Sequence, residues 1–127
     1  MSEPDPIQEL ADYIADEVGV VPDGIRRMEA FGPDWVKAFT AIRKAVSDDR
    51  PEGLDPGMQS LIFMVIATTL NHVDGAVAHA RHAMKRGVPT ASVVQALSQV
   101  MLFAGTHTWA RTGSVVVREL GLTEDPQ

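Results

Sequence analysis

The spacing of apolar residues is helical along almost the whole chain, and this spacing limits the fold more than any other feature. Near the N-terminus apolar side chains recur every three or four residues, at Ile7, Leu10, Ala11, Ile14 and Val18. That period places them on one face of an α-helix. The best candidate for a strand, the three valines at 115–117, is too short to compete. The sequence therefore predicts an all-α protein.

Proline and glycine divide the first half of the chain into helices. Breaks at 22–24 and 32–33 separate a helix after Pro6, a short helix over 25–31 and a helix that ends near Ser47. The N-terminal helices are thus expected within residues 6–47. Residues 48–57 are polar and rich in Asp, Pro and Gly, which predicts a loop.

The second half is more apolar. Residues 58–70 are apolar on nearly every side, as in a helix buried in a core or between subunits. Asn71 or Asp74 interrupts or caps the pattern, and Thr90 is a suitable N-cap. Further helices are predicted over 75–86, 90–104 and 107–120, separated or closed by Gly87, Gly105 and Gly121. We expect residues 1–127 to form one domain, a bundle of about six helices whose C-terminal helix reaches about residue 120.

Composition excludes several classes of protein. The net charge of −6 argues against a nucleic-acid partner. The chain has no cysteine, which removes disulfides, thiolate metal sites and cysteine nucleophiles, and suits a cytoplasmic location. No signal pattern opens the sequence, and the longest apolar run, 61–67, is too short to span a membrane.

Three of the four histidines fall in one short stretch. His72, His79 and His82 are spaced at i, i+7 and i+10. On a single helix they would span roughly 80° of its surface. This geometry alone leaves proton chemistry and metal binding open.

From about residue 54 to 113 the sequence resembles the carboxymuconolactone decarboxylase and AhpD-like superfamily. The resemblance rests on the segments LDPGMQSLIFMVIATTL, HARHAMKRGVPTASVVQAL and MLFAGTHTWA, in that order. It implies an all-α, AhpD-like helical bundle that assembles as a homo-trimer or homo-hexamer, with sites at or near subunit contacts.

The chain departs from the redox members of that family. Their pattern is Cys-x-x-Cys-x-x-x-His with a preceding Glu, often after an Arg. Here the cysteine positions hold His72 and Gly75, and the Arg-Glu pair is replaced by Gln59 and Ser60. The relay histidine remains, as His79. Without a thiolate there is no peroxidatic sulfur, so the resemblance indicates the non-redox branch, which includes decarboxylases of small unsaturated lactone or keto acids.

Two histidines are the candidates for catalysis. His79 suits a general acid/base, because histidine has an ordinary pKa near 6.5; the alternative is a structural histidine bonded between helices. His72 would lie about 10 Å along the helix from His79, which leaves room for a small anionic substrate. The alternative for His72 is a polar residue at the start of a helix.

The candidates for substrate binding are Arg111, His107, Trp109 and Ser60. His107 and Arg111, at i and i+4, could form a corner that binds a carboxylate, or a solvated or interface surface. Trp109 is either an anchor of the core or an aromatic platform. Ser60 could bind substrate or its own helix backbone. His79 and His82 could hold a metal, but no carboxylate shares their face, so none is expected.

Three functions follow. The first is a cofactor-free lyase that acts on a small unsaturated lactone or keto acid through His79 and His72. The second is a non-catalytic oligomeric binding protein on the same scaffold. An alkylhydroperoxidase-like antioxidant protein is the third, and the lack of cysteine speaks against it. The expected partners are a small anionic substrate and other copies of the chain, without cofactor, nucleic acid or membrane.

Overall fold

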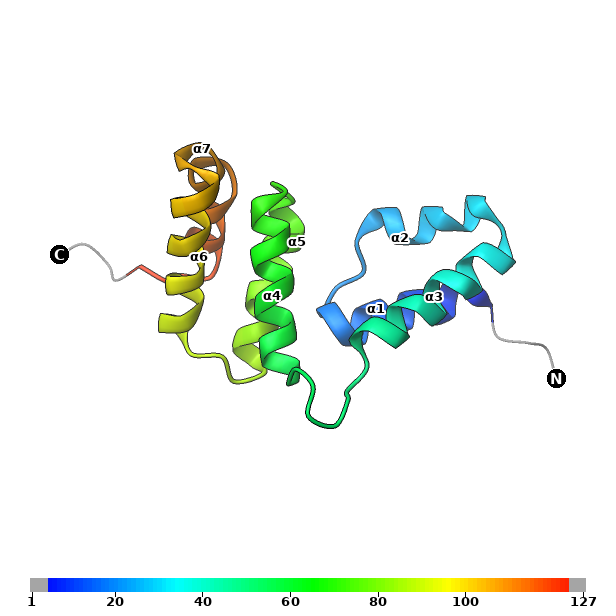
Figure 1. The fold of residues 1–127 in the computed structure, drawn as a ribbon. Coiled ribbons are helices and arrows are strands. Elements are labelled where there is room, and N and C mark those ends of the chain that lie inside the picture. The colour runs from blue at the N-terminus through cyan, green and yellow to red at the C-terminus, as the bar shows by residue number, and fades with distance from the viewer. Residues whose placement is uncertain (1–4, 124–127) are drawn as a thin grey trace. The chain divides into compact units, whose positions relative to one another are not determined.

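The computed structural model describes residues 5–123, which form helices and no strand (Figure 1). The all-α prediction is confirmed. The chain forms two compact units, Met1–Glu52 and Gly53–Gln127. The expectation of one domain over residues 1–127 stays a prediction. None of the helices in the described part of the chain is long and apolar enough to cross a membrane.

The first unit is built on α1 and α3. It contains α1 (Pro6–Val18), α2 (Asp23–Arg27), the 3-10 helix η1 (Met28–Phe31) and α3 (Pro33–Ser47). The Asp5 carboxylate caps α1 by accepting a hydrogen bond from the Ile7 N–H. The predicted apolar face of α1 is buried, at Ile7, Leu10, Ala11, Ile14 and Val18.

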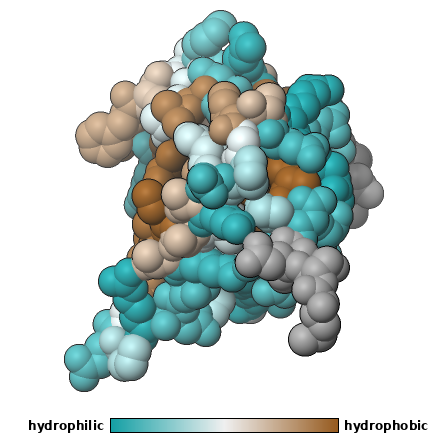
Figure 2. Space-filling model, turned by 90° about the vertical axis from the view of Figure 1, so that its right-hand side faces the viewer, coloured by the Kyte–Doolittle hydropathy of each residue, from teal (hydrophilic) through white to brown (hydrophobic). Residues whose placement is uncertain are grey.

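The apolar side of α3 is only partly covered. Val36 and Thr40 are buried, and the Thr40 hydroxyl donates to the Val36 carbonyl. Other apolar residues of this unit stay exposed, namely Val20, Phe31, Trp35, Ile42 and Val46. The rings of Phe31, Trp35 and Phe39 lie one against the next, with centroids 4.6 and 5.2 Å apart. Figure 2 shows such apolar surface among hydrophilic side chains.

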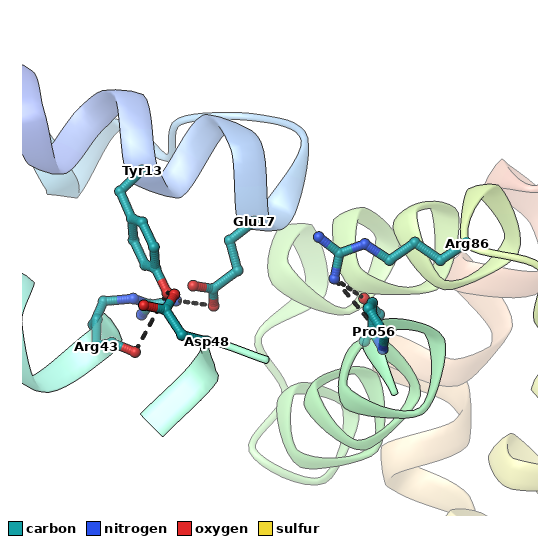
Figure 3. A network of polar contacts seen from close by, with 7 residues as sticks. Tyr13, Glu17, Arg43, Asp48, Pro56 and Arg86 are labelled. Atoms are coloured by element: carbon teal, nitrogen blue, oxygen red, sulfur yellow. Dashed lines mark hydrogen bonds and ion pairs between the residues drawn. The ribbon is translucent and has the colours of Figure 1, made fainter. Parts of the chain in front are cut away.

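A polar network joins the C-terminal parts of α1 and α3. Arg43 forms an ion pair with the buried Glu17 at 2.8 Å, and the Tyr13 hydroxyl donates to Asp48 at 3.0 Å (Figure 3). Burial, the hydrogen bond to Asp48 and the nearby Glu17 carboxylate raise the pKa of Tyr13 above its ordinary value of 10.0.

The raised pKa of Tyr13 predicts a loss of stability at alkaline pH. The folded state holds this proton more tightly than the unfolded state. Its contribution is therefore complete below about pH 10 and is lost as the pH rises toward the folded-state pKa. Tyr13 is the single tyrosine of the chain, so tyrosinate absorbance reports this group alone. We expect it to titrate later in the native than in the denatured protein. We also expect Tyr13→Phe to lose unfolding free energy less steeply above about pH 10 than wild type. Titration at the same pH in both states would contradict this.

The second unit packs a helical hairpin against a third helix and a last helical stretch. It contains α4 (Pro56–Thr69), α5 (Val73–Lys85), α6 (Thr90–Ala104), α7 (Thr106–Thr108), the π-helix η2 (Trp109–Gly113) and α8 (Ser114–Glu119). α4 and α5 lie side by side (Figure 1). The core of the unit is formed by Met64, Ala76, Ala80, Val93, Leu97 and Val116.

α4 is less buried than its composition predicts. It packs against α5 and α6 with Gly57, Ser60, Met64 and Thr68. Its other side exposes Met58 and Ile66, and the following Leu70 is 64% exposed. A helix that is apolar on every side but covered on one side only leaves hydrophobic surface for an assembly.

The turn between α4 and α5 differs from the sequence prediction. α4 ends in a Schellman motif, in which Asn71 has φ +58° and the His72 N–H donates to the Ala67 carbonyl. α5 then begins at Val73, with His72 as N-cap. His72 therefore lies between two helices at the start of α5, which was the alternative expected for it, and the helix predicted over 75–86 likewise left it out. Asp74 lies in the first turn of α5 and is not its cap.

The other helix ends are closer to prediction. Gly87 and Gly121 have positive φ and end α5 and α8 in further Schellman motifs. Thr90 is the first residue of α6 and Pro89 its N-cap, so the prediction of Thr90 as N-cap was wrong by one residue.

The last helical stretch contains a π-helical segment that the sequence did not predict. In η2 the Ser114 N–H donates to the Trp109 carbonyl, five residues back. A Cβ on Gly113 would lie 2.7 Å from Trp109 Cε3, so only glycine permits this packing. π-helical segments are frequent at functional sites.

Candidate functional site

His79 lies on the side of α5 that faces α4. Its ring packs against Phe63 of α4, with centroids 5.3 Å apart and planes tilted by 57°. The side chain is half-buried, and its Nδ1 is shielded from solvent. A half-buried imidazole that packs against an aromatic ring is compatible with the general acid/base role, which stays a prediction.

His72 and His82 lie on either side of His79 along the chain. His72 is exposed and precedes α5, about 10 Å from His79 along the helix axis. His82 is half-buried one turn beyond His79, with both ring nitrogens shielded from solvent. His82 thus shares with His79 a half-buried position on α5, whereas His72 is exposed and precedes the helix. Among residues 5–123 no three side chains of His, Asp or Glu converge on a possible metal position.

Ser60 is bonded to Arg86, a residue that the sequence reasoning did not consider for the site. Arg86 Nη1 donates to Ser60 Oγ at 3.2 Å and to the Pro56 carbonyl at 3.3 Å; Pro56 and Arg86 are labelled in Figure 3. Ser60 is 1% exposed. Ser60 was expected to form a hydrogen bond with a substrate or with the backbone of its own helix, and its hydrogen bond to Arg86 is neither of these. Its role in substrate binding stays a prediction.

The spacing of Arg86 in the sequence could have shown that it shares a helix face with His79. His79, His82 and Arg86 are at i, i+3 and i+7, which places them within roughly 60° on one face of α5. Which side chain of α4 Arg86 meets depends on the register of the hairpin, which no local pattern reveals.

The remaining candidates lie on the last helical stretch. His107 and Arg111 are exposed on α7 and η2. Thr112 Oγ1 donates to Asn71 Oδ1 at 2.9 Å, which brings η2 to the turn that holds His72. Arg111 and His72 thus each adjoin a member of one hydrogen bond. The predicted roles of Arg111 in carboxylate binding and of His72 in catalysis stay predictions.

Trp109 serves the core and also reaches the surface. It packs against the core of the second unit, as the anchor reading expects. It also lines an open groove of about 660 Å³ together with Ser114, Val117, Arg118, Gly121 and Thr123. Neither His72 nor His79, the histidines expected to act in catalysis, lines this groove.

Comparison with known proteins identifies the family. The family model described as carboxymuconolactone decarboxylase family matches residues 33–113, well over half of the chain. The protein belongs to this family. The match extends the resemblance from the second unit back to α3.

One solved structure shows the same fold. A protein of Burkholderia xenovorans LB400, provisionally named a carboxymuconolactone decarboxylase, superposes with a TM-score of 0.78 and 20% sequence identity. The superposition covers 92% of this chain and 95% of that one. At this identity the likeness concerns the fold alone. No curated protein sequence matches the chain.

Proposed function

We propose that the protein is a cofactor-free lyase that decarboxylates a small unsaturated lactone or keto acid with His79 as its acid/base. The observation that supports this most is the position of His79, half-buried against Phe63 on the inner side of α5. Membership of the carboxymuconolactone decarboxylase family supports decarboxylation as the proposed class of reaction. The absence of cysteine argues against the thiol chemistry of the redox branch.

The proposed reaction needs two kinds of group. The carbon–carbon bond to the carboxylate breaks, carbon dioxide leaves, and the electron pair moves onto the adjacent carbonyl as an enolate. A hydrogen-bond donor must stabilise the enolate oxygen, and an acid must return a proton to carbon. We assign the proton to the His79 imidazolium and the donor to His72. Arg111, with His107, would bind a carboxylate of the substrate, and Trp109 and Ser60 complete the proposed binding residues.

Turnover of a panel of acids tests the proposal. Purified protein is incubated with γ-carboxymuconolactone-type acids and β-keto acids, and release of carbon dioxide is measured against buffer. We expect release from at least one acid above the spontaneous rate. The absence of release across the panel would contradict the lyase and favour the alternative, a non-catalytic binding protein. That alternative has its own support, because the family's Glu position holds Ser60, which is buried and bonded to Arg86.

We also propose that the protein acts as a homo-oligomer. Exposed apolar residues of the second unit include Met58, Ile66, Leu70, Val94, Met101, Leu102 and Phe103. Scattered exposed leucines are ordinary, but Leu102 and Phe103 are 75% and 89% exposed and adjacent. Burial of such surface between copies is the expected reason for it.

A further inference from the structure

Arg86 is a cation on the same face of α5 as His79, and the proposed lyase mechanism gives Arg86 no role. It is the C-cap of α5, on the face that also carries His79 and His82. Its backbone is held by the turn at Gly87, where the Val88 N–H donates to the Ala83 carbonyl. The position of this side chain therefore follows from the hairpin and not from a mobile loop.

The guanidinium is fixed against the first turn of α4. One nitrogen, Nη1, bonds both Ser60 Oγ and the Pro56 carbonyl. Gly57 permits this close approach, because a Cβ there would lie 3.0 Å from Val88 Cγ2 and 3.2 Å from the Arg86 carbonyl oxygen. A donor group that is already oriented loses little entropy when it binds a ligand.

The charge of Arg86 is not neutralised within the described chain. Among residues 5–123 it forms no ion pair, whereas Arg43, also half-buried, is matched by Glu17. Nη1 donates both hydrogen bonds of the Arg86 side chain, to the neutral Ser60 hydroxyl and the neutral Pro56 carbonyl. The Nε and Nη2 groups of a guanidinium form a planar pair of donors that matches a carboxylate. A half-buried cation with neutral partners and spare donors is suited to an anionic ligand.

The guanidinium and His79 contact neighbouring turns of α4. The hairpin pairs Phe63 with His79 and Ala67 with Gly75. Ser60, which holds the guanidinium, is one turn before Phe63 on α4, about 4.5 Å along the axis. A short acid could therefore place its carboxylate on Arg86 and its reacting carbon near His79.

We propose that Arg86 binds the carboxylate of an anionic substrate and that Ser60 positions its guanidinium. The proposal rests on the proposed lyase function for the class of ligand, and it transfers to Arg86 the carboxylate-binding role that sequence reasoning gave to Arg111. Ser60 becomes a positioning residue that acts through Arg86.

Binding measurements test this assignment. The probes are maleate, acetoacetate and a butenolide acetic acid, each paired with its methyl ester, and affinity is measured by calorimetry. Wild type should bind at least one acid more tightly than its ester. Arg86→Gln should weaken binding of that acid about 10- to 100-fold, because a hydrogen-bonded charge is removed, and should abolish the preference over the ester. Arg81→Gln, the same change at an exposed position on α5, should leave both unchanged.

Two further variants keep the test decisive if Arg86→Gln does not fold. Arg86→Lys keeps the charge but loses the planar pair of donors, and Ser60→Ala removes the hydroxyl that orients it. Both should weaken acid binding and spare ester binding. Acid affinity within about twofold of wild type in the folded Arg86 variants would overturn the proposal, as would failure of wild type to bind any acid.

The outcomes separate this proposal from the lyase. Acids that bind through Arg86 without release of carbon dioxide would contradict the lyase alone. Release of carbon dioxide with KM unchanged in Arg86→Gln would contradict the role of Arg86 alone.

Discussion

His79→Gln is expected to lower kcat about 100-fold or more, since general acid/base groups contribute 10²- to 10⁴-fold. A loss of 100-fold corresponds to about 2.7 kcal/mol of transition-state stabilisation. Glutamine keeps a hydrogen-bonding side chain of similar size against Phe63 but cannot deliver a proton at neutral pH. The measurement is release of carbon dioxide from the acid that wild type turns over, with the fold monitored by circular dichroism.

The controls for His79 separate chemistry from packing. Lys85→Gln changes an exposed residue of the same helix and should leave kcat unchanged. His72→Gln should have a smaller effect than His79→Gln, because water already surrounds the exposed His72 and limits what one donor contributes. Wild-type turnover by folded His79→Gln would exclude it as the acid/base.

The sequence predicted the features that depend on local spacing. The buried face of α1 and the glycines that end α5 and α8 follow from the period of the helix and from the positive φ that glycine adopts at low cost. Such features require no knowledge of distant contacts. The start of α4 was predicted less well, because the loop was expected to reach residue 57, whereas α4 begins at Pro56 with the Asp55 carboxylate accepting a hydrogen bond from the Met58 N–H.

Features set by tertiary contacts could not be predicted in this way. The bond between Arg86 and Ser60 spans 26 residues and requires the register of α4 on α5. The π-helical segment depends on the packing of Trp109 over Gly113 and on the bond between Thr112 and Asn71. Asn71 could be read as a break, but its positive φ and the Schellman motif that ends α4 before His72 were not predicted. The proposed site therefore extends from the clustered histidines to Arg86.

The double substitution Leu102→Asp/Phe103→Asp is expected to leave the protein monomeric at micromolar concentration, whereas wild type should be a trimer or hexamer. Full burial of a leucine or phenylalanine side chain contributes about 1.5–3 kcal/mol, so each copy would lose several kcal/mol of association energy. The two side chains are 75% and 89% exposed. The substitutions therefore remove little packing within the chain, and the folded monomer should survive. Light scattering coupled to size-exclusion chromatography measures the mass directly.

A matched control lies at the other end of α6. Thr90→Asp/Ala91→Asp adds the same charge at two exposed positions about 18 Å away along the helix axis. Aspartate is favoured in the first turn of a helix, so this variant should fold at least as well as wild type. It should also keep the wild-type mass, because positions 90 and 91 lie outside the exposed apolar surface that we propose to be buried between copies. A monomeric wild type, or an oligomer that survives both aspartates at 102 and 103, would show that the exposed end of α6 is not where copies of the chain meet.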